Sequence, residues 1–352
     1  MFDYKKTNRI VGLDYIRAIS MLLIVLYHYT TRYEELFGRK IVWRISFPFG
    51  CYAVNTFFIL TGFLAMRQLK KKNWFFEKKL FRLYPSLWAC IMITSAFMFN
   101  LMPERLRSFE EILLNFTGIP AYFGAGYVDG AYWTLSVEIL FYFYLTVVAY
   151  FVKEDWSRWY NVFGIWVLIT WALQVLQSKG ISNRVFDLIR TGLLVDKRVI
   201  FLLAGALIFL LKEDLDSGLS KGHVSCKYGF LFIMCLCTAW LSLGFLSGAV
   251  WLFFWGGAIL FFVFHEDCFS FFKRSFFSKL FLFIARVSYP MYLLHQNIGY
   301  AIIRVLEEHG CSIEIWIIVP FFVSLVLATV VHYSIEEPLI NCFNRLDEKK
   351  VD

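Results

Sequence analysis

Ionisable side chains interrupt otherwise apolar stretches of the chain at a few positions. Arg17 and His28 lie in the first stretch, Glu138 is the only charged residue of a later one, and Arg286 and His295 lie in a third. Ionisable groups inside a membrane are costly and commonly functional. A permanent cation is suited to anion recognition, and an imidazole is suited to proton transfer near neutral pH. These residues therefore predict a site that binds an anion and moves a proton.

The spacing of Arg17 and His28 places them on one face of a helix. Eleven residues at about 100° each make three turns and about 20° more, with a rise of about 16 Å. We expect Arg17 near the cytoplasmic mouth of the first span and His28 deeper, toward the outside. In the alternative interpretation, Arg17 extends to a lipid phosphate and His28 is an interfacial residue.

Glu138 ends the sequence Trp133-Thr-Leu-Ser-Val-Glu138 and is followed by apolar residues up to Val152. A lone carboxylate in such a span must be protonated or paired. Arg17 and His28 are the expected partners, and Arg286 is a competing one. The alternative is an ion pair with a structural role only.

The third group of polar residues shares one side of a predicted helix. Tyr289, Tyr292 and His295 recur at intervals of three residues, and Ser288, Tyr292 and His295 also share a side. Tyrosine and serine hydroxyls in this arrangement can hold a hydroxyl or an amide of a substrate. Hydrogen bonding between helices is the alternative.

The segment 67–82 contains seven basic residues, among them Lys79 and Arg82. A basic cluster beside a membrane span usually contacts anionic lipid, but lysine and arginine also bind phosphate groups. Basic segments tend to remain on the cytoplasmic side, so we expect this segment and both termini there. The segment 103–130 then lies outside. Its aromatic and glycine residues suit a carbohydrate, whereas an interfacial helix followed by a turn is the alternative.

Membrane-spanning helices must position these residues, because the composition is unlike that of a soluble domain. The chain is 59% hydrophobic and 18% charged, with a mean hydropathy of +0.60, whereas soluble domains are about 45–50% apolar and about 25% charged. Lipid cannot satisfy open backbone hydrogen bonds, so helices are expected. Ten spans are predicted, at 13–31, 46–66, 83–102, 131–152, 160–178, 198–211, 228–243, 248–265, 280–303 and 316–335.

The predicted fold class is thus an all-α, polytopic membrane bundle of about ten helices. We expect one membrane-embedded domain over residues 1–352, without an appended soluble domain. The net charge of +8 is attributed to cytoplasmic loops and not to nucleic-acid binding. The eight cysteines are scattered and are interpreted as small hydrophobic residues, so no metal site is expected.

Five motifs in order along most of the chain resemble those of the acyltransferase-3 family of integral membrane acyltransferases. They are Arg17 with His28, Phe57-Phe-Ile-Leu-Thr61-Gly62-Phe63, Lys79-Leu-Phe-Arg82-Leu-Tyr-Pro85, Trp133-Thr-Leu-Ser-Val-Glu138 and Ser288-Tyr-Pro-Met-Tyr-Leu-Leu-His295. The chain departs from the family pattern at Thr61 in place of serine, at Asn55 in place of aspartate, and at Lys79 in place of arginine. Because lysine cannot form a bidentate phosphate contact, donor binding could be weaker or differently arranged.

The resemblance implies an O-acyltransferase that moves an acyl group from cytoplasmic acyl-CoA to a hydroxyl of an extracytoplasmic glycan or lipid-linked sugar, and acetyl is the acyl group expected. No permanently bound cofactor is implied, because acyl-CoA is a donor substrate. The expected partners are acyl-CoA, the acceptor and membrane lipid, with a possible homo-oligomer, in the cell (inner or plasma) membrane. The implied roles are catalytic for His28, Glu138 and Arg17, donor-binding for Arg17, Lys79 and Arg82, and substrate-binding for Asn55, Trp133, Tyr289, Tyr292 and His295.

Under this hypothesis His28 is the general base toward the acceptor hydroxyl, and Glu138 orients or charges it. A polysaccharide or lipid-linked sugar exporter without catalysis is the main alternative, because it would also use charges and aromatic residues in the membrane. The absence of a visible internal repeat argues mildly against it. A glycosyltransferase is a further alternative, supported only by Asp214-Leu-Asp216.

Overall fold

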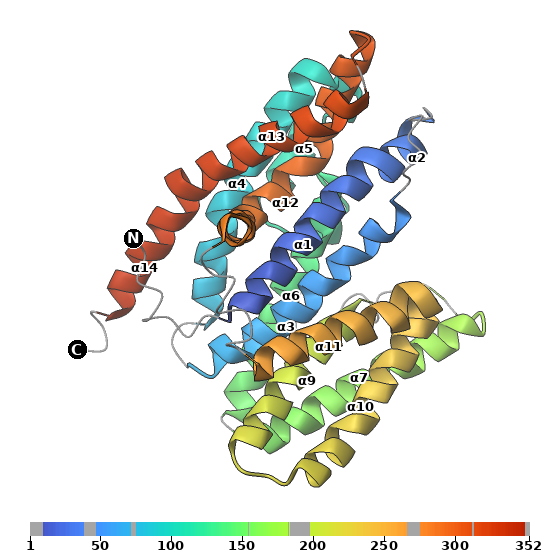
Figure 1. Cartoon of the computed structure of the whole chain (residues 1–352), viewed down its shortest axis with the longest axis vertical. Coiled ribbons are helices and arrows are strands. Elements are labelled where there is room, and N and C mark those ends of the chain that lie inside the picture. The colour runs from blue at the N-terminus through green and yellow to red at the C-terminus, as the bar shows by residue number, and fades with distance from the viewer. Residues whose placement is uncertain are drawn as a thin grey trace. The chain divides into compact units, whose positions relative to one another are not determined.

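The computed structural model of the chain describes residues 10–38, 47–71, 75–153, 155–181, 183, 198–265, 275–311 and 313–348. The described residues form helices and no strands, and nine of their helical segments are long and apolar enough to cross a membrane (Figure 1). The predicted all-α polytopic bundle is thereby confirmed. The cytoplasmic placement of the termini stays a prediction.

The longer helices coincide with the predicted spans, although several extend beyond them. They are α1 (Val11–Tyr27), α3 (Ala53–Leu69), α4 (Phe75–Leu101), α6 (Trp133–Val152), α7 (Trp156–Ser178), α9 (Val199–Asp216), α10 (Lys221–Leu243), α11 (Trp251–Phe264), α12 (Phe276–Glu308) and α13 (Ile313–Val331). Shorter helices are α2 (Tyr33–Phe37), α5 (Phe109–Asn115) and α14 (Glu337–Glu348), and π-helical segments cover His28–Arg32, Phe245–Val250 and His332–Glu336.

The sixth predicted span, 198–211, forms α9, which is not among the nine segments able to cross a membrane. Its uninterrupted apolar part ends at Leu211, because Lys212, Glu213 and Asp214 follow. Thirteen residues rise only about 20 Å, less than the hydrocarbon thickness of about 30 Å. The helix is instead buried all round from Val199 to Leu210, as expected for a helix that is apolar on every side.

The basic segment 67–82 was interpreted as the loop between the spans 46–66 and 83–102, but α3 continues to Leu69 and α4 begins at Phe75. Lys78, Lys79 and Arg82 therefore lie on the first two turns of a helix. The predicted span 83–102 included only the apolar residues of this helix. A helical backbone can continue past the end of an apolar stretch, so the helix begins earlier than the span. Pro85 lies inside α4 and does not mark its start.

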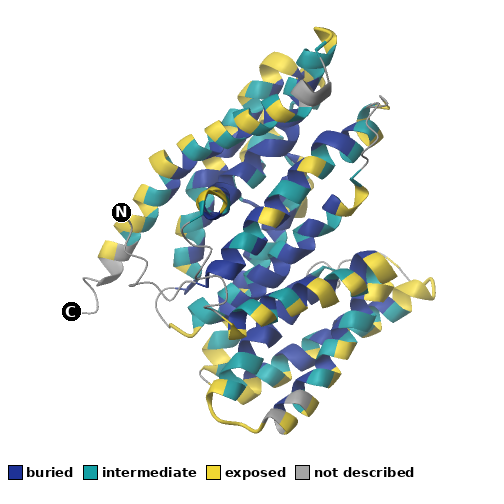
Figure 2. Cartoon of the chain, in the orientation of Figure 1, coloured by how far each residue is buried: buried dark blue, intermediate teal, exposed yellow. Residues whose placement is uncertain are grey.

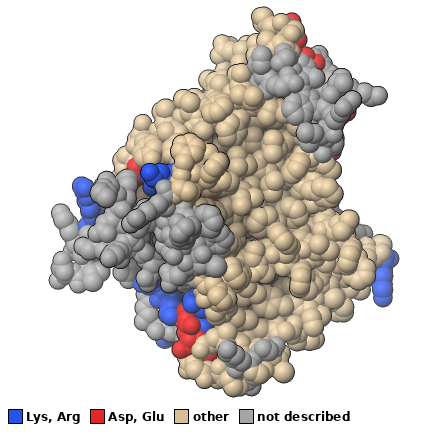
Figure 3. Space-filling view, viewed as in Figure 1, with Lys and Arg blue, Asp and Glu red and all other residues tan. Residues whose placement is uncertain are grey.

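Large apolar side chains are exposed on several of the long helices. Phe99, Tyr150 and Phe253 are 68%, 79% and 73% exposed. Figure 2 shows exposed and buried residues on opposite sides of single helices, and uncharged side chains cover most of the face in Figure 3. Surfaces of this kind are rare on soluble monomers, and they suit helices whose outer sides contact lipid.

The chain divides into two compact units. The first comprises residues 1–20, 54–67 and 155–286, and the second comprises 21–53, 68–154 and 287–352. In the first unit α3 and α9 approach so closely that a Cβ atom on Gly62 or Gly205 would meet the backbone of the other helix. Small residues commonly allow such close packing between membrane helices.

In the second unit, a similar close approach joins α12 to the π-helical segment that follows α1. A Cβ atom on Gly299 would meet the ring of Tyr29, and the Tyr29 hydroxyl donates a hydrogen bond to the His295 carbonyl over 2.9 Å. The hydroxyl of Tyr289 donates to the Leu83 carbonyl of α4 over 2.8 Å. Helix α12 thus contacts the π-helical segment that begins at His28 and the helix α4 that carries Lys79 and Arg82.

Candidate active site

Two histidines from distant parts of the sequence lie together in the second unit. The ring centroids of His28 and His295 are 4.9 Å apart, with the rings at 74° to one another. His28 is the first residue of the π-helical segment His28–Arg32, and π-helical turns often occur at functional sites. The two imidazoles therefore form a pair that sequence spacing alone did not predict.

The hydrogen bond of His295 determines which of its nitrogens carries a proton. Its Nδ1 atom lies 2.8 Å from the Tyr292 carbonyl oxygen, which can only accept. In the neutral ring Nδ1 therefore carries the proton, and Nε2 has a free lone pair. Nε2 is buried and has no hydrogen-bond partner among the described residues.

His28 has a partner that was not predicted. Its Nδ1 atom lies 2.8 Å from the Tyr300 hydroxyl, which can donate or accept. This nitrogen is consequently oriented by a tyrosine of α12 and not by the Glu138 carboxylate that the sequence suggested. When Nδ1 donates to Tyr300, Nε2 of His28 is free to accept a proton.

The beginning of α6 is fixed to α12 by two hydroxyl groups. The Thr134 hydroxyl donates to the Tyr292 hydroxyl over 3.1 Å, and Tyr292 donates to the Ala131 carbonyl over 3.3 Å. Trp133 is the residue before Thr134 and the first of α6. Tyr292 and His295 have ring centroids 5.6 Å apart, so this connection lies beside the histidine pair.

Asp129 connects the loop before α6 to α12. Its two carboxylate oxygens each accept a hydrogen bond of 2.8 Å, one from the Ala131 backbone N–H and one from the Asn297 backbone N–H. The Asn297 amide donates to the Val128 carbonyl. Burial raises the pKa of the Asp129 carboxyl to about 6, although both hydrogen bonds act in the opposite direction. Sequence reasoning missed this residue because the segment 122–130 was interpreted through its aromatic and glycine residues.

Glu138 contacts a tyrosine one turn later on its own helix. Its Oε2 atom accepts a hydrogen bond from the Tyr142 hydroxyl over 3.3 Å. The Lys79 ammonium lies 4.7 Å from the centre of the Tyr142 ring and 5.7 Å from that of Phe75. Lys79 is buried, and contacts with aromatic faces help to stabilise such a cation. Tyr142 therefore lies next to both Glu138 and Lys79.

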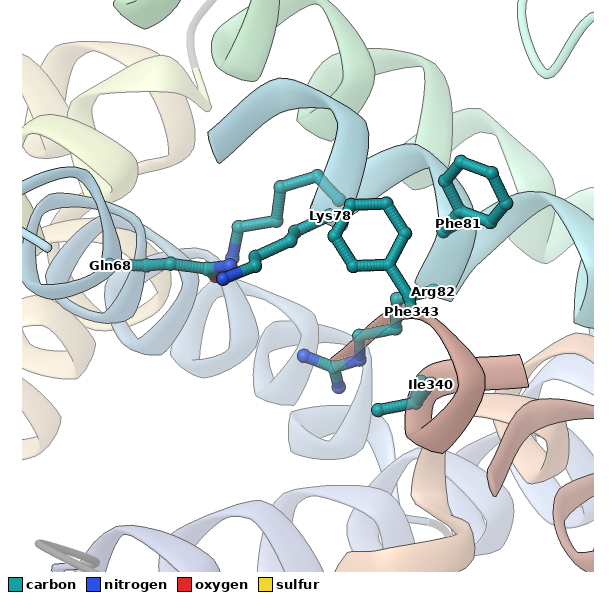
Figure 4. A pocket seen from close by; sticks show the side chains of 7 residues that line it. Gln68, Lys78, Phe81, Arg82, Ile340 and Phe343 are labelled. Carbon is teal, nitrogen blue, oxygen red and sulfur yellow. The ribbon is translucent and has the colours of Figure 1, made fainter. Parts of the chain in front are cut away.

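A pocket lies beside Lys79 in the second unit. It has about 420 Å³ of space, partly open to solvent, and is lined by Gln68, Lys78, Lys79, Phe81, Arg82, Ile340 and Phe343. Figure 4 shows the basic side chains of Lys78 and Arg82 projecting from α4, opposite Ile340 and Phe343 of α14. Three basic side chains around one opening suit a ligand with phosphate groups.

Helix α12 runs from the residues next to the pocket to the histidine pair. Arg82 adjoins Leu83, the residue whose carbonyl accepts the hydrogen bond from Tyr289. From Tyr289 to His295 the helix rises about 9 Å. An extended substrate held by its anionic end in the pocket could thus reach toward the imidazoles along this helix.

Two predicted site residues, Arg17 and Asn55, belong to the first unit. The Arg17 guanidinium lies 3.5 Å from the Asp14 carboxylate, one turn earlier in α1. Asn55 is buried, and its side-chain oxygen has no hydrogen-bond partner among the described residues. The expected pairing of Arg17 with Glu138 stays a prediction.

Asp214, part of the two-aspartate pattern that suggested a glycosyltransferase, has local partners. Its Oδ2 atom accepts hydrogen bonds from Lys227 over 2.6 Å and from Tyr228 over 2.8 Å. Among the described residues no group of histidine, cysteine, aspartate or glutamate side chains could hold a metal ion. In this structure Asp214 joins α9 to α10.

The helical fold, the cationic pocket and the imidazole pair suit a membrane protein that binds an anionic ligand and moves a proton. Residues 10–334 match the model of one family, described as an acyltransferase domain. The chain therefore belongs to the acyltransferase-3 family, as its five motifs predicted, and is a membrane acyltransferase. No curated protein and no solved structure matches it.

Proposed function

We propose that this protein is an O-acyltransferase of the cell membrane, which moves an acyl group, acetyl in the simplest case, from cytoplasmic acyl-CoA to a hydroxyl of an extracytoplasmic cell-surface glycan or lipid-linked sugar. The observation that carries the proposal is the combination of a cationic pocket with two adjacent imidazoles in the same unit. Family membership supports acyl transfer in general. The choice of donor and acceptor follows what the resemblance of the motifs implies; the charges of the pocket support a donor with phosphate groups, and the histidines support a hydroxyl acceptor.

The donor is assigned from the charges of the pocket. CoA carries phosphate groups at one end and its thioester at the other, on a long flexible arm. Lys78, Lys79 and Arg82 line the pocket and would bind the phosphates, since lysine acts as a point charge and arginine as a two-pronged donor. The arm would then follow α12 toward His28 and His295.

The reaction needs a base because a sugar hydroxyl is a weak nucleophile at neutral pH. Nε2 of His28 takes the hydroxyl proton while the oxygen forms a bond to the thioester carbonyl carbon. The carbon–sulfur bond then breaks, and the CoA thiolate takes the proton from the imidazolium. A positioned base typically contributes a factor of about 10²–10⁴. Tyr300 keeps His28 in the required orientation by accepting a hydrogen bond from Nδ1.

A transfer assay tests this function against an exporter. Membranes with and without the protein are incubated with acetyl-CoA that carries a radiolabel in the acetyl group, and alkali-labile label in the glycan fraction is counted. We expect labelled glycan only when the protein is present. Equal labelling in both preparations, with the protein shown to be inserted, would contradict the proposed function and would favour export without catalysis.

A further inference from the structure

A buried carboxylate of the last span is paired with Arg82, one of the residues that line the donor pocket. Glu336 has a side chain only 4% exposed, and its two oxygens have different partners. Oε2 lies 2.8 Å from Nδ1 of His332, and Oε1 lies 3.8 Å from Nε of Arg82. His332 and Glu336 are the first and last residues of the π-helical segment between α13 and α14.

Glu336 shares a helix face with two residues that line the pocket. Ile340 and Phe343 follow it by four and seven residues, which places all three on one face of the helix. Ile340 and Phe343 line the pocket together with Arg82, and the rings of Phe81 and Phe343 have centroids 4.8 Å apart. Glu336 therefore lies on the same helix face as two residues that line the pocket, one turn before the first of them.

The geometry of the ion pair leaves most of the guanidinium free. Glu336 faces the Nε edge of Arg82, whose side chain is 42% exposed. Arginine has four further N–H donors on its two terminal nitrogens. Figure 4 shows the guanidinium end of Arg82 extending away from the ring of Phe343.

We propose that Glu336 is a positioning residue for the donor: it holds Arg82 by its Nε edge so that both terminal nitrogens face a phosphate group in the pocket. His332 fixes the carboxylate in turn by donating from Nδ1. A buried ion pair contributes little net stability, whereas two parallel hydrogen bonds to phosphate need a fixed guanidinium plane. This inference rests on the proposed function, because it assumes a donor with phosphate groups.

The test compares Glu336→Gln with Glu337→Gln in the full-length protein. The neighbouring Glu337 is not among the buried residues and serves as the matched control. We expect Glu336→Gln to raise the KM for acetyl-CoA about tenfold, the size of one charge-assisted contact, with kcat changed less than about twofold. Acetyl-pantetheine, which lacks the nucleotide phosphates, should be used equally well by the variant and the wild type.

A second pair of variants separates positioning from folding. Glu336→Asp keeps the charge but withdraws it from Arg82, and we expect it to raise the KM as well. Combined with Arg82→Ala, the Glu336→Gln change should add nothing further. An unchanged KM in Glu336→Gln, additive effects with Arg82→Ala, or equal losses with acetyl-pantetheine would each overturn the inference. A wild-type protein that neither binds CoA nor transfers acetyl would instead overturn the proposed function.

Discussion

The two imidazoles of the pair differ in how far their hydrogen-bond partners determine the position of the proton. The carbonyl oxygen of Tyr292 determines the protonation of His295, whereas the Tyr300 hydroxyl beside His28 allows either nitrogen to carry the proton. For His28 to act as a base at Nε2, Tyr300 must accept from Nδ1. The Tyr300 hydroxyl therefore affects both the orientation and the tautomer of the base.

We predict that His28→Ala abolishes acyl transfer, by a factor of at least about 100, because a positioned base contributes about that much or more. Tyr300→Phe should have a smaller effect, of about tenfold, since the imidazole stays in place without its hydrogen bond. Transfer of labelled acetyl to glycan measures both. A His28→Ala protein that inserts normally and keeps more than about a tenth of the activity would contradict the role of a general base.

The donor residues are tested by a second set of variants. Lys79→Ala with Arg82→Ala should raise the KM for acetyl-CoA by about 10²-fold, since two contacts to phosphate are lost, and should affect acetyl-pantetheine much less. Lys79→Arg restores the family pattern and should retain or improve donor affinity. Equal losses with both donors would indicate a structural or lipid-binding role for these two residues.

At the scale of residues, the sequence indicated which side chains to consider, but it did not predict which of them contact one another. Tyr300 lies 272 residues after His28, and Asp129 bonds a backbone group 168 residues away. Helical spacing shows which side of a helix a residue occupies, and it contains no information about the element on that side. Tyr300 and Glu336 were missed for this reason, and the partner of Glu138 across the helices stays a prediction.

At the scale of elements, Asp129 joins the loop before α6 to α12, because its carboxylate accepts from the backbone N–H groups of Ala131 and Asn297. We predict that Asp129→Asn destabilises the protein by about 1–3 kcal/mol, because an amide has only one oxygen and one buried N–H donor loses its acceptor. The midpoint of thermal unfolding in detergent measures this effect. Asp155→Asn, at the exposed start of α7, is the control, since asparagine is an equally good helix cap.

The same carboxyl should make stability depend on pH. Its pKa is about 6 in the folded chain and 3.8 ordinarily, so the folded state binds more protons between these values. Its contribution to stability is full below about pH 4 and is lost as the pH rises through about 6. We expect the unfolding midpoint of the wild type to fall over this window relative to that of Asp129→Asn. Parallel curves for the two proteins would contradict the assignment.

Helix positions were largely predictable because long apolar stretches are a strong signal. Their ends were less so. The basic first turns of α4 were expected to be a loop, since apolar character marks the membrane and not the end of a helix. The segment 198–211 was predicted to be a membrane span, but its apolar part is short and it is buried all round from Val199 to Leu210.

At the scale of the whole molecule, the proposed reaction requires the protein to have a defined orientation in the membrane. The basic residues of α4 predict that the donor pocket faces the cytoplasm. The outer loop 103–130 and the histidine pair, which are joined to the later part of α12, would then lie nearer the opposite side. Donor and acceptor would consequently approach the site from different compartments.

Labelling of membrane vesicles of known orientation tests this central claim most directly. Inside-out and right-side-out vesicles from cells that produce the protein are given radiolabelled acetyl-CoA, which does not cross the bilayer, and ester-linked label is counted in their own glycan. We predict labelling in inside-out vesicles, in which the cytoplasmic face is accessible, and none in right-side-out vesicles or in inside-out vesicles of the His28→Ala variant. Labelling confined to right-side-out vesicles, or labelling that does not depend on His28, would contradict the account.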